Sequence, residues 1–508
     1  MNIIRKSNQK YLQFLGQNTR DENQSVRLMK YLVIEDVDNG KAIHNELTRS
    51  FIWIPNEQWN KIYDDLNVDY VQWLWNNYFL VNENYDEHAA QEKLKLNGRP
   101  SCENESYLKS GRIYEFTIFS TMACNARCSY CYEAGRPQKP MTAETARKVG
   151  DWIVKNAMKN GREIQLRWFG GEPLVGEHCI DIICQIVKDA GFNYASSMTT
   201  NGFLFKKEKL DKYRDLWHLR SGQITLDGTE EEYNKIKNYK NVKGKSPYKI
   251  VMDNIQMMAD WGMNISIRMN TCVENAENLK KLIKELYTRF GNHKNIAPYC
   301  WPIFEDDDNP RTAEENELLY TKLREIDEVL DHYGYLHGRD RGTYVRATHC
   351  MIDHGQAVVI GTQGDIGVCE HYSEDHFWGH VDNPEMKDMT EIRKFQDYVE
   401  DYDICNDCPI KPSCIRAKMC HDLRNCNIWI KEWEMRKAHR GVLDMYRRWR
   451  NNVNRNRQNR INQQNQNNQQ QKCNCKQSTC QCNDKVEKIE KEETSGFFNN
   501  ILIWLGLK

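Results

Sequence analysis

The sequence has almost no net charge, no long apolar run and no internal repeat, and each absence excludes a class of protein. The 71 Lys and Arg residues balance 72 Asp and Glu residues, so the formal net charge of -1 creates no global field that attracts nucleic acid or anionic lipid. No stretch of about 18 residues is uniformly apolar, and the first residues are too polar for an export signal. We therefore expect a soluble, cytoplasmic protein without a membrane span or a nucleic-acid partner.

What the sequence does contain is length and cysteine. At about 100 to 200 residues per domain, 508 residues allow three or four units. An odd number of 19 cysteines without an export signal disfavours a disulfide framework and favours bound metal or sulfur chemistry. Five cysteines stand alone, and we expect them to be small buried side chains or neutral thiols: Cys102, Cys179, Cys184, Cys272 and Cys300.

The residue patterns and composition divide the sequence into four regions. Residues 1–108 are expected to form a separate module, in which 31–46 has the pattern of a β-hairpin, 55–66 of a helix, and 70–81 of a helix or an aromatic strand. In residues 109–335, six short β-rich runs alternate with helical ones, which predicts an α/β fold with a parallel sheet or an open barrel. Functional side chains should then follow the carboxyl ends of the strands.

The remaining chain changes in character twice. Residues 336–440 are irregular and rich in cysteine, and the Gly-rich stretch 361–367 within them predicts a hairpin turn rather than a phosphate loop. Residues 441–508 comprise the end of a helix, an Asn/Gln-rich linker at 451–471 and a tail. The tail cysteines at 473–482 are compatible with metal binding, sulfur delivery, mimicry of a cysteine-rich substrate, or disorder without a fixed role.

The most informative motif is the spacing C-x3-C-x2-C formed by Cys124, Cys128 and Cys131. Three thiolates that hold a 4Fe-4S cluster leave one iron open to a ligand outside the protein, whereas a structural zinc site requires a fourth ligand that is not nearby in sequence. With Tyr130 before the last cysteine, this loop closely resembles the signature of the radical S-adenosylmethionine (SAM) superfamily. The resemblance implies a partial (β/α)6 TIM-like barrel over residues 109–335.

Further positions resemble the family's SAM-binding elements. Gly170 and Gly171 would let the backbone approach the ligand, Glu172 would accept from the SAM ammonium group, and Asn201 lies in the third-strand element. Two later strands contribute the other positions that the resemblance implies near SAM: Thr225, Asp227, Arg268 and Asn270. Arg268 is the expected partner of the SAM carboxylate, although ordinary strand packing is an equal alternative for several of these residues.

The resemblance also implies the chemistry. The open iron chelates SAM, and one electron, from a donor such as flavodoxin or ferredoxin, cleaves SAM to a 5'-deoxyadenosyl radical. This radical removes a hydrogen atom from an unactivated carbon, which requires a site that excludes water.

The second cysteine group resembles the SPASM extension of radical SAM enzymes, with a departure in the spacing before Cys420 and a short gap to Cys426. The family's arrangement implies one auxiliary 4Fe-4S cluster on Cys405, Cys408, Cys414 and Cys426, and another on Cys350, Cys369 and Cys420. An open iron on the latter would suit a substrate thiolate, unless His349 or His354 fills it. Glu370 is a candidate catalytic base, and an ordinary exposed carboxylate is the alternative.

The first module resembles the winged-helix domain that recognises leader peptides in ribosomal-peptide maturases, mainly through its strand–strand–helix order and Asn45. A packing extension of the barrel is the alternative. Together these resemblances predict an enzyme with three 4Fe-4S clusters that cross-links a precursor peptide with a leader. A thioether from Cys sulfur is favoured; the alternatives are a carbon–carbon cross-link, sulfatase-maturase-like formylglycine formation, and a non-catalytic iron–sulfur or zinc scaffold that binds a peptide.

Overall fold

The computed structural model describes residues 1–475 except for 99–107, 132, 136, 138, 241, 243, 304–308, 337–354, 368, 371–376, 384–389, 391–402 and 415–425. By its internal contacts the chain divides into two units, Met1–Tyr446 and Arg447–Lys508. In the part of the chain so described, no helix is long and apolar enough to cross a membrane. The predictions for Cys102, Cys350, Cys420, His349 and His354, and for the tail beyond residue 475, fall outside the described residues.

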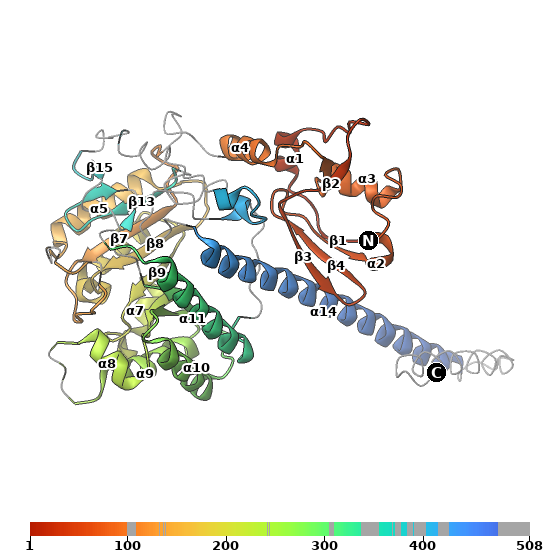
Figure 1. Ribbon diagram of the computed structural model, residues 1–508. Helices are drawn as coiled ribbons and strands as arrows, with labels where there is room; N and C mark the ends of the chain where they lie inside the picture. Colours follow the sequence, from red (N-terminus) through yellow and green to blue (C-terminus); the bar gives the residue numbers. More distant parts are fainter. Residues whose placement is uncertain are drawn as a thin grey trace. The chain divides into compact units, whose positions relative to one another are not determined.

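The first module has a hydrophobic core of its own. A four-stranded antiparallel sheet has the order β1-β5-β4-β3, with β1 at Asn2–Arg5, β3 at Leu32–Val37, β4 at Gly40–Asn45 and β5 at Phe51–Pro55. The predicted hairpin is confirmed as β3 and β4, which register from Leu32↔Asn45 to Val37↔Gly40 (Figure 1). The rest of the module comprises α1 (Gln9–Leu15), α2 (Asn56–Trp59), α3 (Asp69–Asn76) and α4 (Glu87–Gly98), with the strand pair β2 (Val26–Leu28) and β6 (Leu80–Asn82).

Two local predictions need correction in this module. The helix expected at 55–66 is helical only over Asn56–Trp59 and continues as turns, because Asn and the Asp pair at 64–65 favour turn conformations over helix. The segment 70–81 is divided between α3 and β6 rather than being one element.

The α/β region is confirmed as a parallel sheet. All six predicted runs form strands: β7 (Glu115–Thr121), β8 (Ile164–Gly170), β9 (Tyr194–Thr200), β10 (Leu219–Thr225), β11 (Asn264–Thr271) and β12 (Ile296–Pro302). They pair in chain order and in parallel. In a doubly wound sheet the order of the strands reverses at one point, whereas here neighbouring strands follow one another in chain order. This order is consistent with the wall of a barrel.

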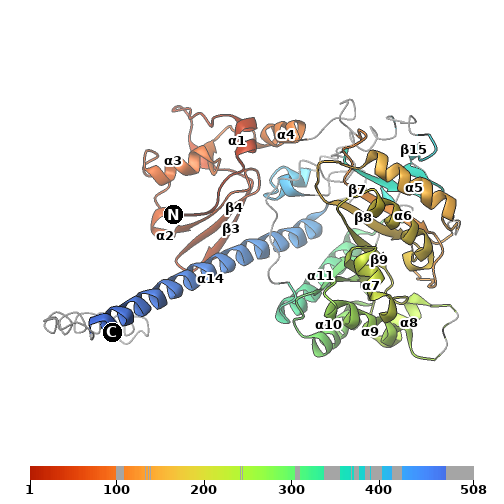
Figure 2. The ribbon, with the colours of Figure 1, turned by 180° about the vertical axis from the view of Figure 1, so that it is seen from behind.

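Helices follow each strand and bury its outward side chains. They are α5 (Ala143–Asn156), α6 (Glu177–Asp189), α7 (Leu210–Asp215), α8 (Glu230–Lys237), α9 (Pro247–Asp260), α10 (Ala276–Phe290) and α11 (Ala313–His332). Figure 2 shows α5 and α6 beside β7 and β8, and α8 to α10 together at the other end of the sheet. The large core between strands and helices also holds Cys179, Cys184 and Cys300, as expected, whereas Cys272 is only partly buried.

The sheet continues beyond β7 with β13 (Ala357–Ile360), β14 (Asp365–Gly367) and β15 (Phe377–His380). The hairpin turn predicted at 361–367 is confirmed, with Gly364 at a φ of 95° between β13 and β14. The predicted linker at 451–471 is instead part of one long helix, α14 (Ile428–Cys475). The side chains from residue 451 to 464 are all exposed, so this part of α14 contributes no core, as its composition predicts.

Candidate functional site

The inward face of the parallel strands is polar along β10 and β11, whereas Phe119 and Phe169 pack together at the ends of β7 and β8. Along β10 and β11, Gln223, Thr225, Ser266 and Arg268 are only partly buried, while their neighbours of opposite parity, such as Ile267, belong to the helix-covered core. Parallel strands covered on both faces are almost continuously apolar, so this alternation indicates a face that is not packed against helices. Such a face can accept a polar ligand at the carboxyl ends of the strands.

The cysteine loop, residues 122–131, begins where β7 ends and is fixed to the end of β8. The Gly171 N–H donates to the Thr121 carbonyl oxygen over 3.0 Å, and the Glu172 N–H donates to that of Ala123, also over 3.0 Å. A Cβ at Gly171 would lie 2.5 Å from the Met122 carbonyl oxygen, and one at Gly170, where φ is 113°, would collide with that of Thr121. The two glycines therefore permit the backbone of the cysteine loop to approach the end of β8.

Glu172 joins the ends of β8 and β9. Its carboxylate has no exposed surface and accepts hydrogen bonds from the Leu174 N–H at 3.2 Å, from the Thr200 hydroxyl at 2.8 and 3.0 Å, and from the Asn201 N–H at 2.8 Å. Burial raises the pKa of Glu172 to about 7, although these hydrogen bonds oppose the rise. In this structure the hydrogen bonds of Glu172 therefore link the ends of β8 and β9.

The three thiols of the cysteine loop are partly buried and influence one another. Burial raises the pKa of all three, to about 11 at Cys124, and the mutual repulsion of the sulfur charges adds to the increase. Among the described residues, no three His, Cys, Asp or Glu side chains lie close enough to hold a single metal ion. A cube offers a separate iron to each thiolate, so its ligands stand farther apart than those of one zinc ion.

Asn201 connects β9 to the cysteine loop. Its Nδ2 donates to the Asn125 side-chain oxygen over 2.6 Å and lies 4.0 Å from the Cys124 sulfur. Its own side-chain oxygen accepts from the Phe203 N–H over 3.0 Å. The structure therefore brings this predicted residue to the first cysteine.

Tyr130 and Asp227 meet at a buried lysine. The Tyr130 hydroxyl donates to the Asp227 carboxylate over 2.7 Å, and the Lys237 ammonium lies 2.9 Å from the same carboxylate and 2.8 Å from the Tyr130 oxygen. Burial opposes the charged form of Lys237, but Asp227, Tyr130 and Cys128 raise its pKa well above the ordinary value. The other Asp227 oxygen, Oδ1, is buried without a hydrogen-bond partner among the described residues.

Thr225, Arg268 and Asn270 lie on adjacent strands at this same edge. Thr225 and Arg268 are register partners on β10 and β11, so both side chains point to the inward face. The Arg268 Nε donates to the Asn270 side-chain oxygen over 2.8 Å, which holds the guanidinium along its own strand.

Glu370 is not brought to this edge. Burial raises the pKa of Glu115, Arg167 lowers it, and the charge of Glu370 adds a smaller rise. Glu370 therefore lies near Glu115, the first residue of β7. The cysteine loop follows the last residue of that strand, Thr121. Cys369 packs against the large core beside Glu370.

The other described cysteines of the second group surround the start of α14. Cys405 and Cys408 are joined by a turn in which the Cys408 N–H donates to the Cys405 carbonyl over 3.2 Å. Burial raises the pKa of Cys408, Lys431 of α14 opposes the rise, and the charges of Cys405 and of Glu46 in the first module add to it. Cys414 and Cys426 are partly buried.

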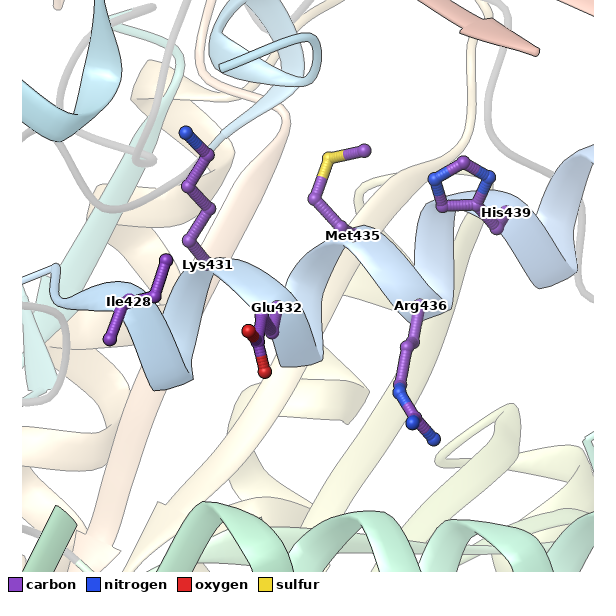
Figure 3. A pocket seen from close by; sticks show the side chains of 6 residues that line it. All are labelled: Ile428, Lys431, Glu432, Met435, Arg436 and His439. Atoms are coloured by element: carbon purple, nitrogen blue, oxygen red, sulfur yellow. The ribbon is translucent and has the colours of Figure 1, made fainter. Parts of the chain in front are cut away.

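Helix α14 carries an open groove of about 460 Å³ next to this cysteine turn. Figure 3 shows Lys431, Met435 and His439 on one side of the helix, and Glu432 and Arg436 on the other. Lys431 donates to the Ile404 carbonyl and His439 pairs with Glu35 of β3, whereas Glu432 and Arg436 pair with Arg324 and Glu328 of α11. The helix therefore connects the first module, the cysteine turn and the α/β region.

Two residues of the site carry no sequence signal. Lys237 lies in a helix whose other lysine, Lys235, is exposed, and Asn125 is an ordinary polar residue between two cysteines. Only the cysteine spacing pointed to their neighbourhood.

Comparisons with known proteins identify one domain of the chain. Residues 118–286 match the model of the radical SAM superfamily. An uncharacterized protein of Methanocaldococcus jannaschii is 21% identical over 286 residues, which cover 56% of this chain and 93% of that protein. The radical SAM cyclopropyl synthase TigE of Paramaledivibacter caminithermalis is 25% identical over 191 residues, or 33% of this chain and 38% of that protein. The solved structure of Streptococcus suis SuiB bound to S-adenosylmethionine has a TM-score of 0.45 and 11% identity, and covers 77% of this chain and 95% of that one. The chain therefore contains a radical SAM domain, which includes the cysteine loop and the ends of β8 to β11.

Proposed function

We propose that this chain is a radical SAM enzyme that modifies a ribosomally made peptide, with a thioether between a Cys sulfur and an unactivated carbon as the favoured product. The observation that carries the proposal is the cysteine loop at the carboxyl edge of a sheet whose inward face carries polar side chains along β10 and β11. A reactive intermediate made there would meet a substrate lying on that face.

The residues present suit a 4Fe-4S cluster and SAM. Cys124, Cys128 and Cys131 would hold the cluster, and these three thiols, with no fourth beside them in the described residues, would leave one iron for SAM. When bound, the cluster and SAM supply a carbon radical that removes hydrogen from an unactivated carbon. Arg268 at the same edge would pair with the SAM carboxylate, and the unpartnered Oδ1 of Asp227 suits a hydroxyl donor such as the ribose.

Glu172 has a more demanding role. Since its carboxylate is fully buried and already accepts from three donors, accepting from the SAM ammonium would require one of these donors to be exchanged. Glu172 would otherwise act on the site by fixing Asn201, which reaches the cysteine loop.

The peptide would be recognised by the first module through strand addition. In its four-stranded sheet, β3 is a six-residue edge strand with regular pairing to β4 and no other strand partner in the described chain. The other edge strand, β1, is shorter and irregular in register, which disfavours further pairing. A leader strand that adds to β3 would gain main-chain hydrogen bonds.

Asp36 of β3 allows a direct test of this surface. Val37 and Gly40 close the two-residue turn, and in such a turn their N–H and C=O groups point toward each other. Hydrogen-bonded and non-hydrogen-bonded pairs alternate along an antiparallel ladder, so the N–H of the preceding residue, Asp36, points away from β4. Asp36→Pro removes that donor, while the matched Asp36→Ala keeps it. The probe is a cysteine-containing peptide encoded next to the gene, incubated with reconstituted enzyme, dithionite and SAM.

Mass spectrometry should show loss of two hydrogens from the peptide with wild-type enzyme and with Asp36→Ala. The Asp36→Pro variant should need a higher peptide concentration for the same conversion. Equal peptide dependence in both variants would exclude β3 as the docking strand, and an unmodified peptide with active SAM cleavage would count against the substrate class.

A second product is favoured by one comparison. The TigE relative is a cyclopropyl synthase, so a carbon–carbon bond within the peptide is the alternative to a thioether. Alkylation of the product thiols with iodoacetamide distinguishes the two, because a thioether consumes a thiol and a carbon–carbon bond does not.

The thioether depends on an open auxiliary site held by Cys350, Cys369 and Cys420. Two auxiliary clusters in addition to the first would give about twelve irons per chain. Glu370 remains a candidate base for the substrate thiol.

A further inference from the structure

Lys237 is a buried cation that the chemistry described above leaves without a role. Its side chain is 4% exposed, its ammonium is paired with Asp227 and hydrogen-bonded to Tyr130, and it lies 5.3 Å from the centre of the Tyr130 ring. A fully buried lysine is rare because removing its charge from water is costly, so its retention calls for a function.

The backbone around Lys237 holds the cysteine loop directly. The Arg127 N–H donates to the Lys237 carbonyl over 2.9 Å, and the Ser129 N–H donates to the Ile236 carbonyl over 3.3 Å. Three residues after the helix ends, the Lys240 N–H donates to the Asn125 carbonyl over 2.9 Å. The last turn of α8 has carbonyls without helical partners, and the cysteine loop supplies the donors that satisfy them.

The Lys237 side chain also lies beside the middle of the cysteine loop. Its ammonium is hydrogen-bonded to Tyr130, two residues after Cys128, and the backbone bonds to Arg127 and Ser129 hold the residues on either side of that cysteine. Because the Lys237 and Asp227 side chains are both buried, their charges act over short distances with little screening.

We propose that Lys237 is a positioning residue of the cysteine loop and that its buried charge raises the reduction potential of the cluster that Cys124, Cys128 and Cys131 would hold. The inference rests on the proposed function. Reduction adds a negative charge to a cluster, and a fixed cation beside one of its sulfurs favours that state. Asp227 and Tyr130 hold the ammonium in place, which links the electron-accepting step to two of the residues expected near SAM.

The test compares Lys237→Met, which keeps the length of the side chain but removes the charge, with Lys237→Arg, which keeps the charge. Lys249→Met is the matched control, because Lys249 is an exposed lysine paired with Glu230 on the surface. Each full-length protein is reconstituted anaerobically, its iron is counted, and the midpoint potential is measured by electron paramagnetic resonance on the signal that changes shape when SAM is added.

Lys237→Met should move the midpoint to a more negative value, and Lys237→Arg and Lys249→Met should leave it near that of the wild type. A fully loaded Lys237→Met protein with an unchanged midpoint would overturn the proposal. If Lys237→Met does not take up iron, the midpoint potential of Asp227→Asn is measured instead. This substitution removes the negative charge that opposes Lys237, so the midpoint potential should rise, and an unchanged value overturns the proposal. Absence of any SAM-responsive signal in the wild type would instead refute the proposed function.

Discussion

Replacing Glu172 by Gln should change how the stability of the protein depends on pH. The side chain is fully buried, and burial raises its pKa from the ordinary 4.5 to about 7. Below pH 4.5 the carboxyl group is protonated in the folded and unfolded chains alike and contributes nothing. Between pH 4.5 and 7 the unfolded chain loses the proton first, so the free energy of unfolding falls as the pH rises.

The magnitude follows from the two pKa values. At about 1.4 kcal/mol for each tenfold change, the difference amounts to about 3 kcal/mol, all of it present above pH 7. Gln has the same shape and does not titrate. Its NH2 group would face the Leu174 or Asn201 N–H, which costs about 1 to 3 kcal/mol at every pH. The free energy of unfolding of Glu172→Gln relative to wild type should therefore rise by about 3 kcal/mol from pH 4.5 to pH 8.

Urea unfolding of the iron-free, reduced proteins, followed by tryptophan fluorescence across that pH range, measures the difference. Glu317→Gln is the control, because Glu317 is exposed on α11 and should show the wild-type pH dependence. If Glu172→Gln and wild type lose stability in parallel as the pH rises, the buried carboxylate is not the group that the structure describes.

Three further changes test the packing. Gly170→Ala should destabilise the protein by at least about 2 kcal/mol more than Gly191→Ala in chemical denaturation. Both glycines have a positive φ, 113° and 75°, but only at Gly170 would the added Cβ meet the Thr121 carbonyl, whereas Gly191 is in open space. Trp433→Ala should cost about 3 to 5 kcal/mol by the same measurement, since this side chain is fully buried and donates to Asp327 over 3.0 Å; a loss below 1 kcal/mol would contradict its place in the core. A chain that ends after Asn452 should unfold within about 0.5 kcal/mol of the full chain, because the described side chains beyond it are exposed, and a larger loss would reveal a contact of the tail.

The sequence was most informative where periodicity and spacing act locally. The six strands of the α/β region were predicted because short β-rich runs alternate with helical segments, and each of these runs forms a strand of the parallel sheet. The cysteine loop was predicted from spacing alone, because three thiols within eight residues have few other uses.

Contacts between segments far apart in the chain could not be predicted from local sequence patterns. Lys237 reaches the cysteine loop from over a hundred residues away, and nothing in its helix separates it from the solvated lysines around it. The close approach of the cysteine-loop carbonyls to the glycines at the end of β8 was likewise not predicted. The helical conformation of 451–464 was missed, because Asn and Gln composition indicates the lack of a core but does not exclude a helix that continues from a packed one.

The central claim is that Cys124, Cys128 and Cys131 support the cleavage of SAM. The direct measurement is 5'-deoxyadenosine formed by the anaerobically reconstituted, dithionite-reduced protein, with Cys128→Ala compared with Cys272→Ala, a partly buried cysteine outside the groups. Wild type and Cys272→Ala should form 5'-deoxyadenosine, and Cys128→Ala should form none. Cleavage retained in Cys128→Ala, or absent from iron-loaded wild type, would contradict the account.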